Sequence, residues 1–225
     1  MANRPVFIPA RSKTSFAREI PIEFRWFAGM SVSQKQKSIE SLHSAIRDQR
    51  GVAKILEISS KSKTPLGVRL SAFNLMMPLN GMKLSVEVVY QASKRFQRGG
   101  PYADILNMSS RDAKTDPRLK DSGALLGFEL DGDPWPLEPT TAFYDWLYLT
   151  ALRANPDLAD ALMGFEAFTD IEFNPEKSLN CQARSAALYV SLMQEGLLEN
   201  ALLNRQSYFE IIGPGTAEKD QKGLF

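Results

Sequence analysis

The sequence has little of the side-chain chemistry on which many enzymes depend, because it contains one cysteine and one histidine. Cys181 excludes an intrachain disulfide and suits a reducing compartment. A zinc site built from Cys and His needs more ligands than the chain has. His43 follows Leu42 in a predicted amphipathic helix, so we favour a structural or surface role for it over a catalytic triad. We therefore expect no metal and no cofactor, and any catalysis to rest on carboxylates, lysines and aromatic rings.

Long apolar runs, phosphate-binding glycine motifs and an excess of one charge are also missing. No apolar stretch approaches the roughly 18 residues that span a bilayer, and the N-terminus lacks the apolar core of a signal peptide. We expect a cytoplasmic protein with no membrane partner. The 27 basic and 26 acidic residues nearly balance, so a broad nucleic-acid-binding surface is not predicted. Lys35 and Lys37 are expected on a solvated helix face, with DNA contact as the less favoured interpretation.

Hydrophobic periodicity predicts an α+β fold in one domain, dominated by helices with a small β-sheet. Alternating apolar residues predict strands at 4–9, 18–27 and 52–59. Capping residues and apolar faces predict helices at 34–47, 86–96, 102–108, 140–153, 156–164 and 179–194. The stretch 116–139 is rich in glycine and proline and is expected to be loop. The sheet therefore comes largely from the N-terminal third.

A polar stripe on the predicted helix 86–96 is the most informative feature. Glu87, Tyr90, Gln91 and Lys94 follow one another at i, i+3, i+4 and i+7, so they share one face of a helix. Such a face is usually solvated. The alternative is a pocket lined by a carboxylate and an amine that lie roughly 10 Å apart along the helix axis.

Five short elements, in order along the chain, resemble the NADAR family, also called YbiA-like. Its hallmark E-H-x-x-Q-A-x-K-F is similar to Glu87-Val-Val-Tyr90-Gln91-Ala-Ser-Lys94. The other four are Ser71-Ala-Phe73-Asn74, Ser109-Ser-Arg-Asp-Ala-Lys114, Asp145-Trp146, and Asn180-Cys-Gln-Ala with Leu188. The first 60 residues resemble the subgroup encoded beside guanine-directed DNA ADP-ribosyltransferase toxins.

Two departures from the family pattern concern the site. Val88 stands where the family usually has a histidine, and the late W-G motif with its preceding Asp is not visible. The nearest acidic segment holds Asp170 and Glu172, which are the candidates for a further acid.

The resemblance implies one NADAR-like domain over 1–225, with an N-terminal extension over about 1–60 and a core over about 66–195. It implies hydrolysis of an N-glycosidic bond and, for the subgroup, removal of ADP-ribose from guanine in DNA by an antitoxin. The implied partners are ADP-ribosylated DNA as substrate, ADP-ribose as product and the cognate DNA ADP-ribosyltransferase toxin.

Glu87 and Lys94 suit this chemistry on their own terms. Cleaving a ribosyl C–N bond needs a proton for the leaving nitrogen and stabilisation of the sugar carbon. Glu87 can act as acid or base, and a neutral Lys94 can form a transient imine with open-chain ribose. The candidate substrate-binding residues are Ser71, Phe73, Asn74, Tyr90, Gln91, Tyr144, Trp146, Asp170, Glu172 and Asn180.

Several interpretations of the candidate site remain open from the sequence. Tyr144 and Trp146 either stack on bases or fill the core. Arg69, and Arg98 with the 99–101 loop, are weaker candidates for contact with a pyrophosphate. Two other functions compete with the antitoxin hydrolase: an N-glycosidase acting on riboflavin-pathway intermediates, and a non-catalytic module that binds ADP-ribose or the toxin.

Overall fold

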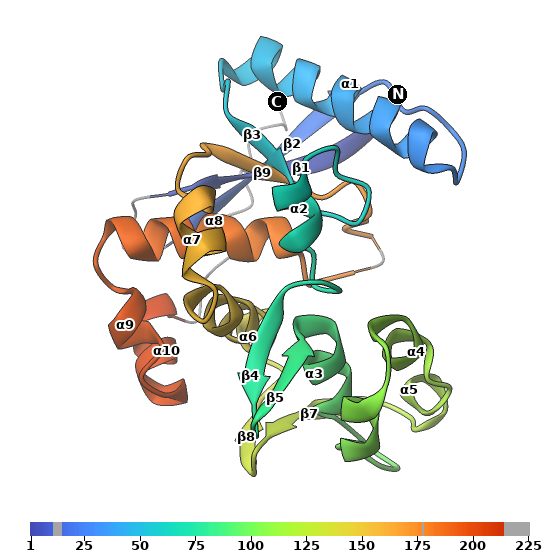
Figure 1. Cartoon of the computed structure of the whole chain (residues 1–225), viewed down its shortest axis with the longest axis vertical. Coiled ribbons are helices and arrows are strands. Elements are labelled where there is room, and N and C mark those ends of the chain that lie inside the picture. Colours follow the sequence, from blue (N-terminus) through green and yellow to red (C-terminus); the bar gives the residue numbers. More distant parts are fainter. Residues whose placement is uncertain (11–14, 177, 214–225) are drawn as a thin grey trace, which may run out of the picture. The chain divides into compact units, whose positions relative to one another are not determined.

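The computed structural model describes residues 1–10, 15–176 and 178–213, and it has the predicted α+β fold (Figure 1). The chain forms two compact units, Met1–Ser71 with Asp157–Phe225, and Ala72–Pro156. The single domain over 1–225 stays a prediction. Within the described ranges, no helix is both long and apolar enough to cross a membrane. The polar composition after Gly213 predicts a loose tail, and that segment lies outside the described residues.

The first unit is built on a four-stranded sheet in the order β2-β1-β9-β3. Its strands are β1 (Ala2–Pro9), β2 (Ala17–Phe24), β3 (Ile55–Glu57) and β9 (Ala167–Thr169). Strand β9 pairs antiparallel with β1 and parallel with β3. The alternating residues Ile20, Ile22 and Phe24 pack against helix α1 (Val32–Arg50), and α8 (Gln182–Gln194) packs on the other face (Figure 1).

The three helices predicted for this unit, at 34–47, 156–164 and 179–194, are present with shifts of up to three residues at their ends. Ser31 caps α1 by accepting a hydrogen bond from the Gln34 amide, and Gly51 ends it in the left-handed conformation at φ 66°. The helix therefore extends beyond the predicted residue 47 to Arg50. The other helices are α2 (Pro65–Arg69), α7 (Pro156–Leu162), α8, α9 (Leu198–Ala201) and α10 (Arg205–Ile212). Of these, α2, α9 and α10 are not predicted from the sequence.

A buried chain of polar contacts lies between α1 and the sheet. The Thr169 hydroxyl donates to Glu57 Oε2 over 2.6 Å, so its oxygen is left to accept from His43 Nε2 at 2.9 Å. Glu57 Oε1 accepts from the Ile171 amide at 2.9 Å. Burial, and then the charge of Arg47, lower the pKa of His43 to about 4. These contacts agree with the structural role predicted for His43.

The second unit contains two hairpins, neither of which is predicted from the sequence. Strands β4 (Met76–Leu79) and β5 (Met82–Ser85) pair with each other, and β7 (Leu125–Leu130) lies between β6 (Lys94–Phe96) and β8 (Asp133–Trp135). The predicted loop over 116–139 is therefore wrong. Asp131-Gly132 has φ 50° and 79°, as required by a two-residue turn whose twist matches the strands. Asp131-Gly132 is the sequence feature from which the β7–β8 hairpin could be predicted.

The predicted helix over 86–96 is wrong beyond its second turn. Helix α3 (Val86–Ala92) ends at Ser93, whose hydroxyl donates to the Val89 carbonyl. The Ser93 carbonyl then accepts from the Glu129 amide, and Lys94 pairs with Phe128 across the β6–β7 ladder. Hydrogen bonds to β7 thus replace a third helical turn. The remaining helices are η1 (Ala103–Asn107), α4 (Ser110–Thr115), α5 (Arg118–Asp121) and α6 (Ala142–Arg153).

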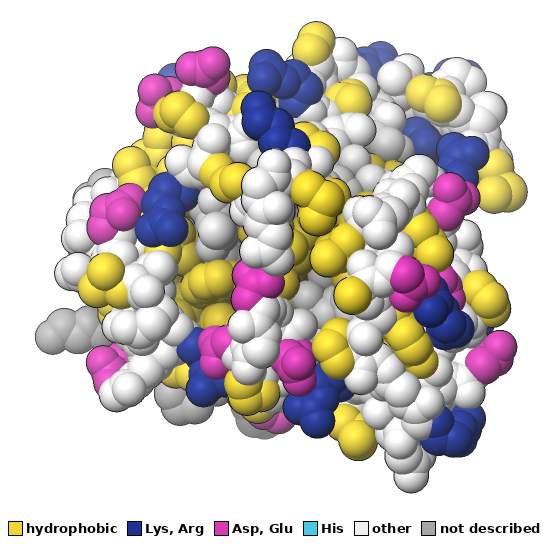
Figure 2. Space-filling view, turned by 60° about the horizontal axis from the view of Figure 1, so that its bottom comes forward, with side chains coloured by type: hydrophobic (Ala, Val, Ile, Leu, Met, Phe, Trp, Pro, Cys, Tyr) yellow, Lys and Arg dark blue, Asp and Glu magenta, His cyan; other side chains and the backbone are white. Residues whose placement is uncertain are grey.

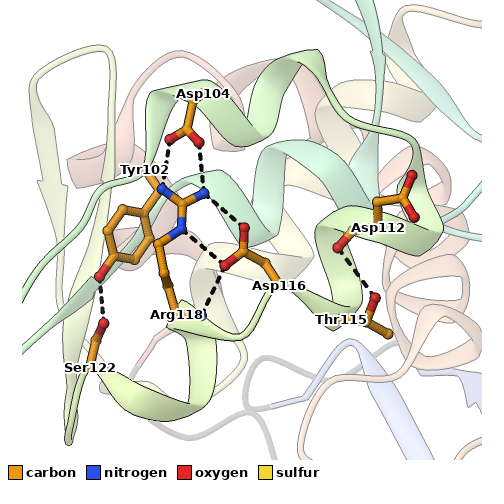
Figure 3. A network of polar contacts seen from close by, with 7 residues as sticks. All are labelled: Tyr102, Asp104, Asp112, Thr115, Asp116, Arg118 and Ser122. Atoms are coloured by element: carbon orange, nitrogen blue, oxygen red, sulfur yellow. Dashed lines mark hydrogen bonds and ion pairs between the residues drawn. The ribbon is translucent and has the colours of Figure 1, made fainter.

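An arginine network fixes the segment from η1 to α5 (Figure 3). The Arg118 guanidinium donates to both carboxylate oxygens of Asp104 and to both of Asp116. Its Cζ also lies 4.5 Å from the centre of the Tyr102 ring. With its donors engaged, Arg118 serves the fold of this segment rather than an anionic ligand.

Candidate active site

Helix α3 places Glu87 and Gln91 side by side, one turn apart. Ser85 caps the helix by accepting from the Val88 amide, and an acid in the first turn suits the helix dipole. Both side chains are buried, with 6 % exposed. Gln91 Nε2 donates to Glu87 Oε1 at 2.9 Å. The predicted shared helical face therefore holds for these two residues.

The side-chain oxygen of Gln91 is an open acceptor. Gln91 Oε1 is buried and has no hydrogen-bond partner among the residues that the structure describes. A buried acceptor without a partner costs about 1–3 kcal/mol. A hydroxyl or N–H of a ligand that enters beside Glu87 would remove this penalty.

Lys94 lies at the start of β6, and its amine reaches back over α3. Nζ is 4.8 Å from the centre of the Tyr90 ring. Burial, opposed by the charge of Glu87 and helped by that of Lys114, lowers the pKa of Lys94 to about 8. Relative to an ordinary lysine, the neutral and nucleophilic fraction at pH 7 rises by roughly two orders of magnitude.

The Lys94 backbone lies so close to Gly100 that no side chain fits at position 100. Gly100 has φ +80°, and a Cβ added there would lie 2.2 Å from the Lys94 carbonyl oxygen. Only glycine accommodates both the positive φ and this approach. The 99–101 loop therefore supports the Lys94 backbone. Arg98 of the same segment donates to the Asp121 carbonyl at 2.6 Å.

An aromatic cluster surrounds Tyr90. Its ring centre lies 5.4 Å from that of Phe128, 6.3 Å from Phe143 and 5.2 Å from Tyr144. Tyr144 is buried within this cluster and meets Tyr90 edge-on. The Tyr90 ring lies beside the Lys94 amine, whose pKa is lowered by burial. Phe128 joins the cluster through the pairing of β7 with β6, which nothing in the local sequence indicates, and Phe143 joins it from α6.

Two further motif elements meet close to α3. Ser110 of α4 donates to the Phe73 carbonyl at 3.0 Å and lies 2.7 Å from the Ser85 hydroxyl. Lys114 Nζ lies 5.0 Å from the centre of the Phe73 ring. Asn74 follows at an exposed position. Lys114 was part of a recognised motif, but its influence on Lys94 was not foreseen.

The sequence as a whole matches a known family. Residues 2–222 match the family model described as the DarT1-associated NADAR antitoxin. The chain belongs to this family. A search of curated proteins found no match. NADAR proteins generally have N-glycosidase activity, and membership of an antitoxin family implies a toxin as partner.

Trp146 of this NADAR antitoxin packs on a second tryptophan. Its ring centre lies 5.1 Å from that of Trp135. Trp146 Nε1 is buried and finds no acceptor in the described part of the chain. The indole is half-buried, so both stacking on a base and filling the core stay open.

The other predicted substrate-binding residues lie in the first unit. The Ser71 hydroxyl donates to the Val68 carbonyl at the end of α2. Asp170 Oδ1 accepts from the amides of Glu172 and Phe173, which closes a tight turn after β9. Burial, and then the charge of Glu57, raise the pKa of Asp170.

Glu172 and Asn180 differ in exposure. Glu172 is exposed and accepts from Ser60, whereas Asn180 is half-buried ahead of α8. The hydrogen bonds of Ser71 and Asp170 join residues near in sequence, whereas that of Glu172 reaches Ser60. The role of all four first-unit residues at a substrate stays a prediction.

Proposed function

We propose that this NADAR antitoxin is an N-glycosyl hydrolase that removes ADP-ribose from guanine bases of DNA and so reverses the modification made by the toxin. The proposal rests above all on the match of residues 2–222 to the DarT1-associated NADAR antitoxin family. It is supported by a lysine amine over the Tyr90 ring, whose pKa is lowered to about 8, and by the buried Glu87 one turn from Gln91. Lysines with lowered pKa values in apolar surroundings are typical of imine-forming enzymes. Pure binding of ADP-ribose would not require a neutral amine.

The proposed reaction uses Lys94 as nucleophile and Glu87 as proton carrier. Glu87 in its acid form protonates the ribose ring oxygen, the C1″–O bond breaks, and the lone pair of the guanine nitrogen turns the C1″–N single bond into a double bond. Neutral Lys94 Nζ adds to C1″, and guanine leaves with a proton returned through Glu87. Water then hydrolyses the lysine imine, which releases ADP-ribose and restores the amine.

The decisive experiment offers the protein a DNA oligonucleotide that carries ADP-ribose on one guanine. We expect free ADP-ribose and unmodified DNA as products, identified by mass spectrometry. An oligonucleotide with ADP-ribose on its terminal phosphate is the matched control and should stay intact. Tight binding without release would support the binding module instead, and turnover of riboflavin-pathway N-glycosides alone would support the second hydrolase.

The ionisation of Lys94 gives a test that needs no substrate. Between pH 6 and 11, competitive labelling with an amine-reactive reagent should show Lys94 reactivity rising about tenfold per pH unit and levelling above about pH 8. The reactivity rises because the fraction of Lys94 in the neutral amine form increases until the pH exceeds the pKa. Lys83, an exposed lysine of β5, is the internal reference. A plateau for Lys94 above pH 10 would contradict the proposed nucleophile.

A further inference from the structure

Three basic side chains of the first unit lie over two aromatic rings. Arg4 Cζ is 5.5 Å and Lys35 Nζ is 4.9 Å from the centre of the Trp26 ring. Arg25 Cζ is 4.8 Å from the centre of the Phe27 ring. These five residues, here called the basic–aromatic patch, come from β1, from the segment after β2 and from the first turn of α1.

The cations of the patch are not neutralised within the described ranges. Arg25 and Lys35 have no carboxylate partner there, and Arg4 donates to the backbone carbonyl of Asn3. The chain as a whole carries a formal charge of +1, and acidic and basic side chains are mixed across the face in Figure 2. Because the charges of the whole chain nearly balance, the three cations form a local excess of positive charge that the overall composition does not predict.

Contact with the rings prepares these cations for an anionic ligand. A cation over an aromatic face is held in place by the ring quadrupole, so less side-chain entropy is lost when it meets an anion. Next to the patch, Met30 is 95 % exposed and Val32 is 51 % exposed. The surface thus combines positive charge, half-buried aromatic rings and apolar contacts, and basic and aromatic side chains together are used to bind unpaired nucleic-acid strands.

We propose that the basic–aromatic patch binds single-stranded DNA. Arg4, Arg25 and Lys35 contact phosphates, and the rings of Trp26 and Phe27 meet unstacked bases. The inference deepens the proposed function, on which it rests for the choice of DNA as partner. A duplex would offer phosphates but no free base faces, because its bases are already stacked.

Binding of unmodified DNA tests the patch without any hydrolysis. The full chain is titrated against a labelled single-stranded oligonucleotide, long enough for the roughly 4–16 nucleotides of a typical site, and fluorescence anisotropy is followed at several salt concentrations. The test variant combines Arg4→Ala, Arg25→Ala and Lys35→Ala. The control combines Arg18→Ala, Arg50→Ala and Lys54→Ala, three exposed cations of the same unit, and so makes the same change in net charge.

We expect the test variant to bind at least about tenfold more weakly near 0.1 M salt, with the slope of log K against log salt reduced by about 2. The control should stay within about threefold of the unchanged protein. Lys35→Glu alone, at a half-buried position in the first turn of α1, should weaken binding while leaving the circular dichroism spectrum unchanged. Equal affinity of the test and control variants, or tighter binding of duplex than of single strands, would overturn the proposal.

A second readout separates this inference from the proposed hydrolase. With ADP-ribosylated substrates, the test variant should raise KM for a long oligonucleotide several-fold and leave turnover of ADP-ribosylated guanosine unchanged. If the unchanged protein releases no ADP-ribose but the patch substitutions still weaken DNA binding, the hydrolase fails and the patch stands. If release occurs and the patch substitutions affect neither binding nor KM, the patch fails and the hydrolase stands.

Discussion

Replacing Lys94 by methionine should lower the release of ADP-ribose from modified guanine DNA by about 10³-fold or more. The same change should abolish the covalent adduct trapped by borohydride in the presence of substrate. Methionine keeps an unbranched side chain over the Tyr90 ring but removes the amine that forms the imine. Release is followed by chromatography and trapping by intact-protein mass spectrometry.

Lys83→Met is the matched control, because Lys83 is an exposed lysine in β5 of the same unit. We expect full activity and full trapping from it. An adduct that persists in Lys94→Met would show that another residue forms the covalent bond. Substantial release without any adduct would point to direct attack by water, with Lys94 limited to binding.

The second large effect is expected at Glu87. Glu87→Gln should reduce release by about 10²- to 10³-fold, because glutamine fills the same space and cannot carry a proton. The buried hydrogen bond from Gln91 Nε2 can persist, since the new amide still offers an oxygen acceptor. We therefore expect the fall in kcat with little change in thermal stability, measured by steady-state kinetics and a melting curve.

Glu129→Gln controls for the loss of one acid in this unit. Glu129 lies on β7 and forms a partly exposed ion pair with Arg95 at 3.7 Å, a contact of the kind that contributes little to stability. Its replacement should leave release unchanged. Equal losses in the two variants would show that net charge, rather than proton transfer at Glu87, controls the rate.

Elements with strong local signals were predicted well, and those that depend on distant partners were not. Ile20, Ile22 and Phe24 alternate because one side of β2 faces the core, and that period is visible in the sequence. The end of α3 at Ala92 could not be seen in this way, because the competing hydrogen bonds come from β7 more than thirty residues away. The β7–β8 hairpin is not predicted, because the glycine and proline content of residues 116–139 favours a loop. The dipeptide Asp131-Gly132 is nevertheless typical of a hairpin turn.

Residue identities and their order along the chain are enough to predict the α+β class, the family and the candidate pair Glu87 and Lys94. They predict one helical face for the pair. The structure instead puts Glu87 on α3 and Lys94 on β6, with the Lys94 amine over the Tyr90 ring of α3, and the catalytic roles of the two residues stay a prediction.

The reactivity of the Lys94 amine, in contrast, depends on the folded structure. A lysine has an ordinary pKa wherever water surrounds it, and nothing in its neighbours along the chain changes that. Folding removes water from around Lys94, while Glu87 and Lys114 set the local charge. Their combined effect lowers the pKa to about 8, because the cost of burying an ammonium ion depends on what packs around it in three dimensions.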